Sequence, residues 1–203
     1  MADRQAARPK KNHSNMNQNK TMKGQKIKAT ATATVNAELP AHPLVIFAVD
    51  LLRERNQTVS FAESCTGGLL SAIFTRLPGV SDVFAGSVVA YSYEVKQSLL
   101  QVPEPMLKSL GAVSLPVAKQ MARGVRKNLQ TSWAVSVTGI AGPNGGSAQK
   151  PVGTVCFGIV GPGVEEVVQR QFDGDRRQVQ GASARFALRL LISYLVGKTA
   201  EQK

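Results

Sequence analysis

The chain changes from a strand pattern to a helix pattern across one tight turn, in Thr58-Val59-Ser60-Phe61-Ala62-Glu63-Ser64-Cys65-Thr66-Gly67-Gly68. β-Branched and aromatic residues predict a short strand over 58–62, and a helical pattern follows over 68–77. The glycines allow backbone N–H groups to approach a ligand closely, and the helix N-terminus adds partial positive charge there. The hydroxyl of Ser64 on this turn is therefore a candidate nucleophile, although the same turn also suits a phosphate.

On either side of this turn, strands and helices alternate along the chain. Gly161-Pro162-Gly163 joins two β-rich runs so closely that they must form an antiparallel hairpin. We therefore predict an α/β fold, a three-layer α/β/α sandwich with a mixed, mostly parallel sheet of about five strands. The predicted helices cover 43–56, 68–77, 94–101, 104–110, 115–129 and 175–196, and the predicted strands cover 58–62, 83–90, 133–137, 154–160 and 166–172.

The composition is that of an ordinary globular protein. Of the 203 residues, 43% are hydrophobic and 19% are charged, which fits one domain of about 150 residues plus an appendage. No apolar run approaches the roughly 20 residues of a membrane span, and no apolar block follows the basic N-terminus as in a secretory leader. We therefore expect a cytoplasmic protein without a membrane partner.

The net charge of +12 is unevenly distributed. Residues 1–40 contain eight basic and two acidic residues, so this segment holds half of the excess charge. Because residues 1–39 lack aromatic residues and any sustained period, we predict a basic disordered tail, with the folded domain over 40–203. Such a tail favours only non-specific contacts with nucleic acid, so an RNA-associated function ranks last among the alternatives.

The sequence gives little support to metal, disulfide or histidine chemistry. Cys65 and Cys156 match no zinc or redox spacing, so we expect no metal and no other cofactor. His13 and His42 belong to no motif, which argues against a Ser–His–Asp triad. Lysine is the natural substitute, because a buried lysine loses its proton more readily and then acts as a base. The thiol of Cys65 is a less favoured alternative nucleophile.

Lys96 is the lysine best placed to activate Ser64. Tyr91 stands at the end of the predicted strand 83–90, and Lys96 lies at the start of the following helix. The carboxyl ends of parallel strands meet at one edge of a sheet, where α/β proteins bind their ligands. These three residues are therefore expected to converge at that edge, together with Thr138. The alternatives are a solvated surface lysine and a buried tyrosine with a satisfied hydroxyl.

A second glycine-rich segment directly follows the predicted strand 133–137, with the sequence Thr138-Gly139-Ile140-Ala141-Gly142-Pro143-Asn144-Gly145-Gly146. Such glycine density indicates either close approach to a ligand or a sharply turned structural loop. The segment matches neither the P-loop nor the dinucleotide-binding fingerprint. Lys150, Arg176 and Arg177 flank it in sequence and are candidates for contacting a phosphate, although each is also an acceptable surface charge.

An ordered set of motifs resembles the CinA C-terminal family, which contains the bacterial nicotinamide mononucleotide deamidases. The resemblance covers roughly residues 43–197, which is effectively the whole predicted domain. In chain order, the motifs are Ala62-Glu63-Ser64-Cys65-Thr66-Gly67-Gly68, Ala90-Tyr91-Ser92 with Lys96, Gly111-Ala112-Val113-Ser114, Thr138-Gly139-Ile140-Ala141-Gly142-Pro143 with Gly145-Gly146, Lys150-Pro151-Val152-Gly153-Thr154-Val155, and Gly174-Asp175-Arg176.

This resemblance implies an amidohydrolase that converts nicotinamide mononucleotide to nicotinate mononucleotide and ammonia in pyridine-nucleotide salvage. It implies a metal-free and cofactor-free homodimer, with Ser64 as nucleophile, Lys96 as its base and Tyr91 as a supporting hydroxyl. Backbone N–H groups of the turn 66–68 are expected to stabilise the oxyanion, while the glycine loops and basic residues hold the phosphate. The expected substrate-binding residues are Thr66, Gly67, Gly68, Thr138, Gly139, Ala141, Gly142, Lys150 and Arg176.

The chain departs from the family pattern at two positions. Tyr93 stands where the family usually has Asn, and a phenol there is expected to narrow the pocket or remove an amide hydrogen bond. In the last helix, relatives often place an arginine near Gln180, and its absence here is expected to lower the affinity for phosphate. The alternative function is therefore a catalytically silent CinA-like paralogue that binds a mononucleotide without turning it over.

Overall fold

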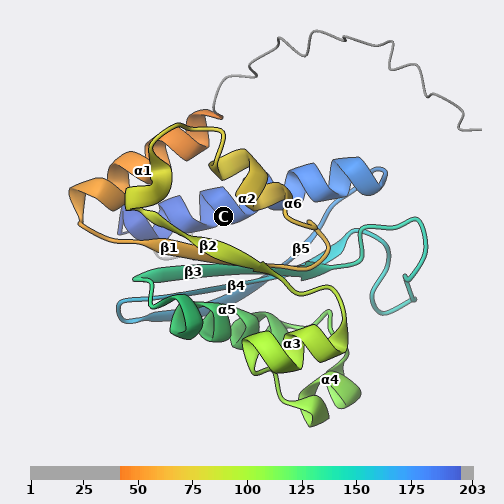
Figure 1. Ribbon diagram of the computed structural model, residues 1–203. Helices are drawn as coiled ribbons and strands as arrows, with labels where there is room; N and C mark the ends of the chain where they lie inside the picture. The colour runs from red at the N-terminus through yellow and green to blue at the C-terminus, as the bar shows by residue number, and fades with distance from the viewer. Residues whose placement is uncertain (1–41, 198–203) are drawn as a thin grey trace, which may run out of the picture. The chain divides into compact units, whose positions relative to one another are not determined.

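In the computed structural model, which describes residues 42–197, a five-stranded sheet lies between two layers of helices (Figure 1). The predicted tail, 1–39, lies outside the described residues. The helices are α1 (Pro43–Glu54), α2 (Leu69–Phe74), α3 (Tyr93–Leu100), α4 (Glu104–Leu110), α5 (Leu115–Leu129) and α6 (Arg176–Leu195), with a 3₁₀ turn η1 (Val80–Asp82). The strands are β1 (Val59–Glu63), β2 (Phe84–Val89), β3 (Trp133–Gly139), β4 (Thr154–Gly161) and β5 (Val164–Gln171).

The sheet has the order β2-β1-β3-β4-β5 and is mixed, as predicted. β1 is parallel to both of its neighbours, β2 and β3, whereas β4 is antiparallel to β3 and to β5. All strands except β4 therefore run in the same direction. The predicted hairpin is confirmed, because Gly161 pairs with Val164 directly across the Pro162-Gly163 turn. The parallel half, β2-β1-β3, is the part of the sheet that carries the candidate site.

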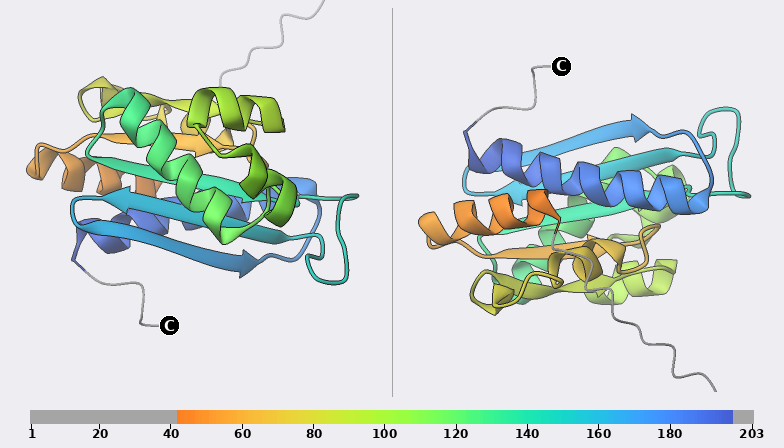
Figure 2. Two further views of the ribbon diagram at one scale, coloured as in Figure 1. Left: turned by 90° about the horizontal axis from the view of Figure 1, so that it is seen from below. Right: turned by 90° about the horizontal axis from the view of Figure 1, so that it is seen from above.

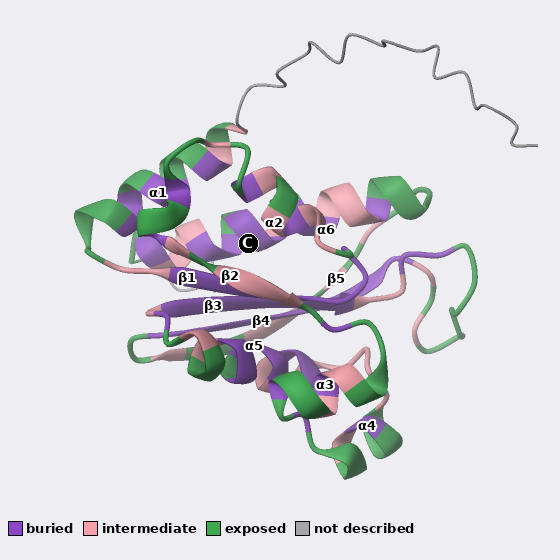
Figure 3. Cartoon of the chain, viewed as in Figure 1, coloured by how far each residue is buried: buried purple, intermediate pink, exposed green. Residues whose placement is uncertain are grey.

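The helices divide between the two faces of the sheet, which confirms the three-layer prediction. Helices α1, α2 and α6 lie on one face and α3, α4 and α5 lie on the other (Figures 1 and 2). Because β1 is an inner strand covered on both faces, all five of its residues are buried. The edge strand β5 instead mixes half-buried and exposed residues, as Figure 3 shows by colour.

The alternation of side chains along β1 builds a separate core on each face of the sheet. Phe61 points toward α1, α2 and α6, where its ring lies 5.3 Å from that of Phe74 and 5.1 Å from that of Phe84. Ala62 belongs to the core beneath α3 and α5. On that second face, α5 approaches α3 closely at Gly124, where an added Cβ would lie 2.1 Å from the Leu100 carbonyl oxygen. This close approach fixes α3, the helix that carries Lys96.

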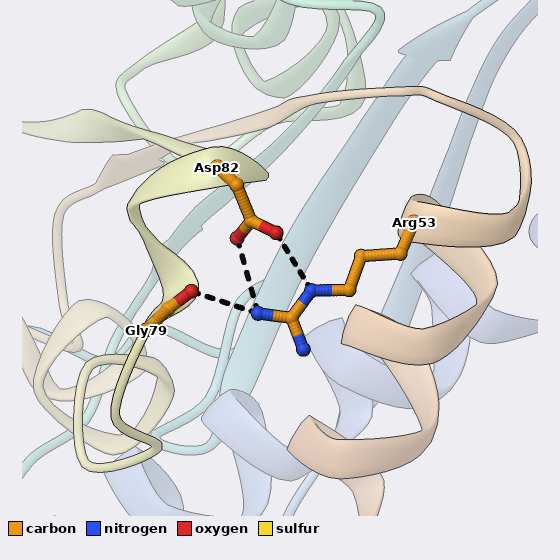
Figure 4. A network of polar contacts seen from close by, with 3 residues as sticks. All are labelled: Arg53, Gly79 and Asp82. Atoms are coloured by element: carbon orange, nitrogen blue, oxygen red, sulfur yellow. Dashed lines mark hydrogen bonds and ion pairs between the residues drawn. The ribbon is translucent and has the colours of Figure 1, made fainter.

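The end of α1 is connected to η1, the turn that precedes β2. The Arg53 Nε and Nη2 atoms donate to the Asp82 carboxylate at 2.7 and 3.2 Å, and Nη2 also donates to the Gly79 carbonyl at 2.7 Å (Figure 4). The pair is exposed, so its bidentate geometry contributes positioning more than stability. No helix within residues 42–197 has the length and apolar character needed to cross a membrane.

Most predicted elements agree with the structure to within two residues, and α2 is the main exception. The helix predicted over 68–77 ends at Phe74. Pro78 disfavours helical backbone at the residue before it, and Gly79 adopts a left-handed φ of 75°. The chain therefore leaves the helix early and turns into η1.

Candidate active site

Ser64 directly follows β1, the middle strand of the parallel half of the sheet, where three parallel strands end together. Glu63, the last residue of β1, is paired with Val89 at the end of β2 and with Val137 near the end of β3. The turn after β1, the segment after β2 and the glycine loop after β3 therefore share one edge of the sheet. The predicted convergence of these three segments is present in the structure. Ser64 itself is only 8% exposed.

The two residues predicted to form a nucleophile and base are in direct contact. The Nζ atom of Lys96 lies 3.0 Å from the Oγ atom of Ser64. Nζ also contacts the carbonyl oxygens of Ala90 at 2.6 Å and of Tyr91 at 3.2 Å. Lys96 is completely buried, so the alternative of a solvated surface lysine is wrong. Its partners in the described residues are one hydroxyl and two carbonyls, and no carboxylate is among them.

The surroundings of Lys96 favour its uncharged form. Burial is the dominant influence and lowers the pKa of the Lys96 amine from 10.5 to about 8, with a smaller opposing contribution from Cys65. At pH 7 about a tenth of the molecules then carry a neutral lysine, and at pH 8 about half do. A neutral amine within hydrogen-bond distance of a serine hydroxyl is a competent general base.

A buried carboxylate orders the turn that carries Ser64. Glu63 is completely buried, and its carboxylate accepts hydrogen bonds from the amides of Gly68, Leu70 and Ser71 and from the Ser71 hydroxyl. The carboxylate thus caps the N-terminus of α2, where unpaired amides and the helix dipole favour negative charge. The motif pattern in the sequence assigns no role to Glu63. The available signal was an acidic residue at the end of a strand that is otherwise entirely apolar or small.

The backbone amides of this turn are not equally available to a ligand. Among the described residues, the Thr66 amide has no hydrogen-bond partner, and the buried Thr66 hydroxyl has none either. Thr66 is only 3% exposed. Three other amides of the turn have protein acceptors: Ser64 N bonds Val137 O at 2.9 Å, Gly67 N bonds Ser64 O at 3.1 Å and Gly68 N bonds a Glu63 carboxylate oxygen at 3.0 Å. The Cys65 amide, like that of Thr66, has no acceptor among the described residues. Of the three expected oxyanion donors, Thr66 is therefore the one left free.

The glycine-rich segment after β3 owes much of its glycine content to packing. A Cβ added at Gly139 would lie 2.7 Å from Val155 Cγ2, and one added at Gly142 would lie 2.6 Å from Val152 Cγ1. Gly142 also has a left-handed φ of 85°. The sequence left open a ligand cradle or a structural loop, and these contacts favour the structural role for both glycines. Ala141, also expected to bind substrate, is buried beside them.

Arg176 connects the glycine loop to Tyr91. Its Nη1 atom donates to the Gly142 carbonyl at 2.9 Å, and its Nη2 atom donates to the Tyr91 hydroxyl at 3.1 Å. The Tyr91 side chain is 63% exposed, so the alternative of a buried tyrosine is wrong. The link from Tyr91 to Lys96 runs through the Tyr91 backbone carbonyl, whereas the Tyr91 hydroxyl contacts Arg176.

Two other expected substrate-binding residues anchor the loop between α4 and α5. The Lys150 Nζ atom donates to the carbonyl of Leu110 at 2.8 Å and to that of Val113 at 2.7 Å. The Thr138 hydroxyl donates to the carbonyl of Ala112 at 2.9 Å. These bonds hold the 110–113 segment against the site, so the observed contacts of both side chains are structural.

Neither cysteine is activated. Burial raises the pKa of the Cys65 thiol to about 12 and that of Cys156 to about 11. Both thiols are free. A thiol that stays protonated at neutral pH is a poor nucleophile, which favours Ser64 over its neighbour Cys65.

Residues 42–195 match the family model of the CinA C-terminal domain. The chain belongs to this family. A CinA-like protein of Synechococcus sp. (strain RCC307) is 50% identical over 143 residues, 69% of this chain and 34% of that protein. A CinA-like protein of Prochlorococcus marinus is 44% identical over 153 residues, 74% of this chain and 36% of that protein. The chain thus spans about a third of the length of these CinA-like relatives.

Solved structures of CinA proteins share the fold. The competence damage-inducible protein A from Klebsiella pneumoniae subsp. pneumoniae is 32% identical, with a TM-score of 0.75, over 78% of this chain and 99% of that one. The competence/damage inducible protein CihA from Agrobacterium tumefaciens is 36% identical, with a TM-score of 0.69, over 74% of this chain and 94% of that one.

The two departures from the CinA pattern occupy different parts of the site. The Tyr93 hydroxyl accepts a hydrogen bond from the Ala112 amide at 3.2 Å, so this phenol helps hold the loop between α4 and α5. Gln180, on α6, donates from Nε2 to the Cys65 carbonyl at 2.8 Å, directly beside the nucleophile. The sequence predicts a connection of Gln180 with phosphate affinity, whereas its contact in the structure is with the Ser64 turn.

Proposed function

We propose that this CinA-family domain is an amidohydrolase that converts nicotinamide mononucleotide to nicotinate mononucleotide and ammonia. Ser64 is the nucleophile and Lys96 is its general base. The observation that carries the proposal is the 3.0 Å contact between Ser64 Oγ and the Nζ atom of a completely buried lysine. A buried cation costs several kcal/mol unless paired, and a site that accepts this cost next to a hydroxyl has a chemical use for the amine.

The partners of Lys96 orient its lone pair. A neutral amine has two N–H groups, and two carbonyl oxygens, those of Ala90 and Tyr91, lie within reach of Nζ. With both N–H groups donated to these carbonyls, the lone pair of Nζ faces the third neighbour, the Ser64 hydroxyl. The hydroxyl then donates its proton to Nζ as Oγ attacks the carboxamide carbon.

The remaining steps follow from the same pair of side chains. Attack by Oγ forms a tetrahedral intermediate whose oxyanion requires a donor, and the Thr66 and Cys65 amides, both without an acceptor among the described residues, are available near Ser64. The Lys96 ammonium returns its proton to the leaving nitrogen, so ammonia departs and an acyl-enzyme remains. Lys96 then removes a proton from water, which cleaves the ester and restores Ser64.

The entrance to the site suits an anionic pyridine nucleotide. The Arg176 guanidinium is exposed and uses two of its five N–H groups on Gly142 and Tyr91, which leaves donors for a phosphate. The exposed Tyr91 ring provides an apolar surface beside it for a flat heterocycle. This arrangement supports a mononucleotide rather than a neutral amide as the substrate.

Ammonia release from nicotinamide mononucleotide tests the proposal. The wild-type protein is expected to release ammonia, and Ser64→Ala is expected to release none above the uncatalysed rate. Ser109→Ala is the matched control, because the Ser109 hydroxyl bonds only carbonyls of its own helix at an exposed position. Equal rates in wild type and Ser64→Ala reject the serine mechanism. Calorimetric binding of the nucleotide without ammonia release identifies a silent binding paralogue instead.

A further inference from the structure

Gln180 makes a contact with the nucleophile turn that the reaction as described does not use. It lies on α6, which packs beside α2 on the same face of the sheet (Figure 1). Its Nε2 atom donates to the carbonyl oxygen of Cys65 at 2.8 Å, across 115 positions of sequence. Among the described residues this is the only hydrogen bond that the Cys65 carbonyl accepts. The carbonyl of the Cys65–Thr66 peptide group therefore depends on one side chain for its hydrogen bond.

That peptide group also contains the Thr66 amide. In a planar trans peptide the C=O and N–H bonds point in opposite directions. Because Gln180 draws the Cys65 carbonyl toward α6, the Thr66 N–H must point away from α6. This amide has no partner among the described residues, although Thr66 is only 3% exposed and its hydroxyl is unpartnered as well. Buried polar groups without partners are rare in folded proteins, and two on one residue beside a nucleophile indicate a ligand atom.

We infer that Gln180 is a positioning residue that holds the Cys65–Thr66 peptide so that the Thr66 amide binds the substrate carbonyl oxygen. The inference rests on the amidase proposed above. Without the Gln180 amide, no other side chain in the described part of the chain fixes the Cys65 carbonyl, and the peptide plane loses its one direct hydrogen bond. The Thr66 N–H then spends less time directed at the developing oxyanion. Such preorganisation matters most in the transition state, so its loss lowers kcat rather than raising KM.

The experiment compares three variants with the wild type. Gln180→Met removes the donor while keeping the length of the side chain. Gln180→Arg restores an N–H donor at the same position. Gln120→Met is the matched control, because Gln120 also donates from Nε2 to a backbone carbonyl, that of Gln101 at 3.1 Å, away from the nucleophile turn. For each protein, kcat and KM are measured with nicotinamide mononucleotide and with the neutral ester p-nitrophenyl acetate, together with the thermal midpoint.

For Gln180→Met we expect kcat to fall by about 10- to 100-fold on both substrates, while KM stays within about twofold of the wild-type value. This fall in kcat is smaller than the one expected from complete removal of an oxyanion donor. Gln180→Arg is expected to recover most of this loss. The pH at half-maximal rate, set by Lys96, is expected to stay where it is in the wild type. If Gln180 has a purely structural role, Gln180→Met and Gln120→Met should lower kcat equally, and each fall should match the decrease in thermal midpoint.

The two substrates separate this inference from the proposed function. If the wild type cleaves the ester through Ser64 but not nicotinamide mononucleotide, the amidase proposal fails while the ester still measures the effect of Gln180→Met. An unchanged kcat in Gln180→Met on whichever substrate is cleaved overturns the role of Gln180. Absence of Ser64-dependent cleavage of both substrates overturns the inference together with the proposed function.

Discussion

Replacing Lys96 with methionine removes the general base while keeping a side chain of similar length in a completely buried position. General-base catalysis contributes about 10²- to 10⁴-fold, so kcat for ammonia release from nicotinamide mononucleotide is expected to fall by at least about 100-fold. In the wild type the rate is expected to rise with pH and to reach half of its maximum near pH 8, because the active form contains the neutral amine. That rise is expected to disappear from any residual activity of Lys96→Met.

The same titration affects stability. The pKa of Lys96 is about 8 in the folded protein against 10.5 as its ordinary value. Between these two values the unfolded chain binds more protons than the folded one, so the free energy of unfolding rises with pH. Keeping Lys96 fully protonated in the folded protein lowers the free energy of unfolding by about 3 kcal/mol. About 2 kcal/mol of this free energy is regained between pH 7 and pH 9.5. Lys96→Met lacks this contribution at every pH.

Urea unfolding of wild type and Lys96→Met at pH 7, 8, 9 and 9.5 isolates the effect of the lysine. The difference is needed because other groups titrate in this range, including the thiols of Cys65 and Cys156, whose raised pKa values destabilise the folded state above about pH 9. The Cys156 contribution is common to both proteins and cancels, and the Cys65 contribution largely cancels, because Lys96 is only a minor influence on the pKa of Cys65. The stability of the wild type relative to Lys96→Met is expected to increase by about 2 kcal/mol across the series.

Two results would exclude a neutral, burial-shifted Lys96 as the general base. A difference in unfolding free energy that stays constant with pH would mean that Lys96 is not shifted by burial. A wild-type rate that is independent of pH between 7 and 9.5 would mean that a neutral Lys96 is not required for the chemistry. Ser64→Ala provides the control, since it retains the buried lysine and should keep the pH-dependent stability while losing the activity.

Three further changes test other parts of the site. Glu63→Gln replaces an acceptor of the Gly68, Leu70 and Ser71 amides with a side chain that presents its own N–H groups. We expect the free energy of unfolding in urea to fall by about 2–4 kcal/mol. A fall below about 0.5 kcal/mol would contradict the capping role. Tyr91→Phe removes the hydroxyl bonded by Arg176; we expect KM to rise severalfold with kcat nearly unchanged, and a large fall in kcat would instead assign the hydroxyl to the chemistry. Gly124→Ala places a Cβ 2.1 Å from the Leu100 carbonyl oxygen and displaces α3. We expect this substitution to lower both the thermal midpoint and kcat. The control Ala122→Gly, in the same helix, should lower the thermal midpoint with less effect on kcat.

The sequence was sufficient for the fold because its local signals agree. The alternation of strands and helices predicts the three layers, and Gly161-Pro162-Gly163 predicts the antiparallel hairpin without any knowledge of distant contacts. The edge of the sheet on which Ser64 and Lys96 meet follows from strand direction, because parallel strands end together.

The finer structure of the site depends on contacts that no local pattern encodes. Gln180 reaches Cys65 across 115 positions, and Lys150 reaches Leu110 across 40 positions. Such pairings are set by how α6 and the glycine loop pack on the sheet. Lys150 consequently contacts carbonyls where a phosphate contact was expected. Glycine density was similarly ambiguous, and only the positions of Val152 and Val155 show that Gly139 and Gly142 permit close packing.

Trapping the covalent intermediate is the most direct test of Ser64 as the nucleophile. Wild-type protein mixed with nicotinamide mononucleotide is quenched in acid within the first turnovers, digested and analysed by mass spectrometry. The account predicts an adduct on Ser64 with the mass of the nucleotide minus ammonia, absent from Ser64→Ala. Ammonia release with Ser64 unmodified at every quench time, or an adduct on Cys65, would contradict it.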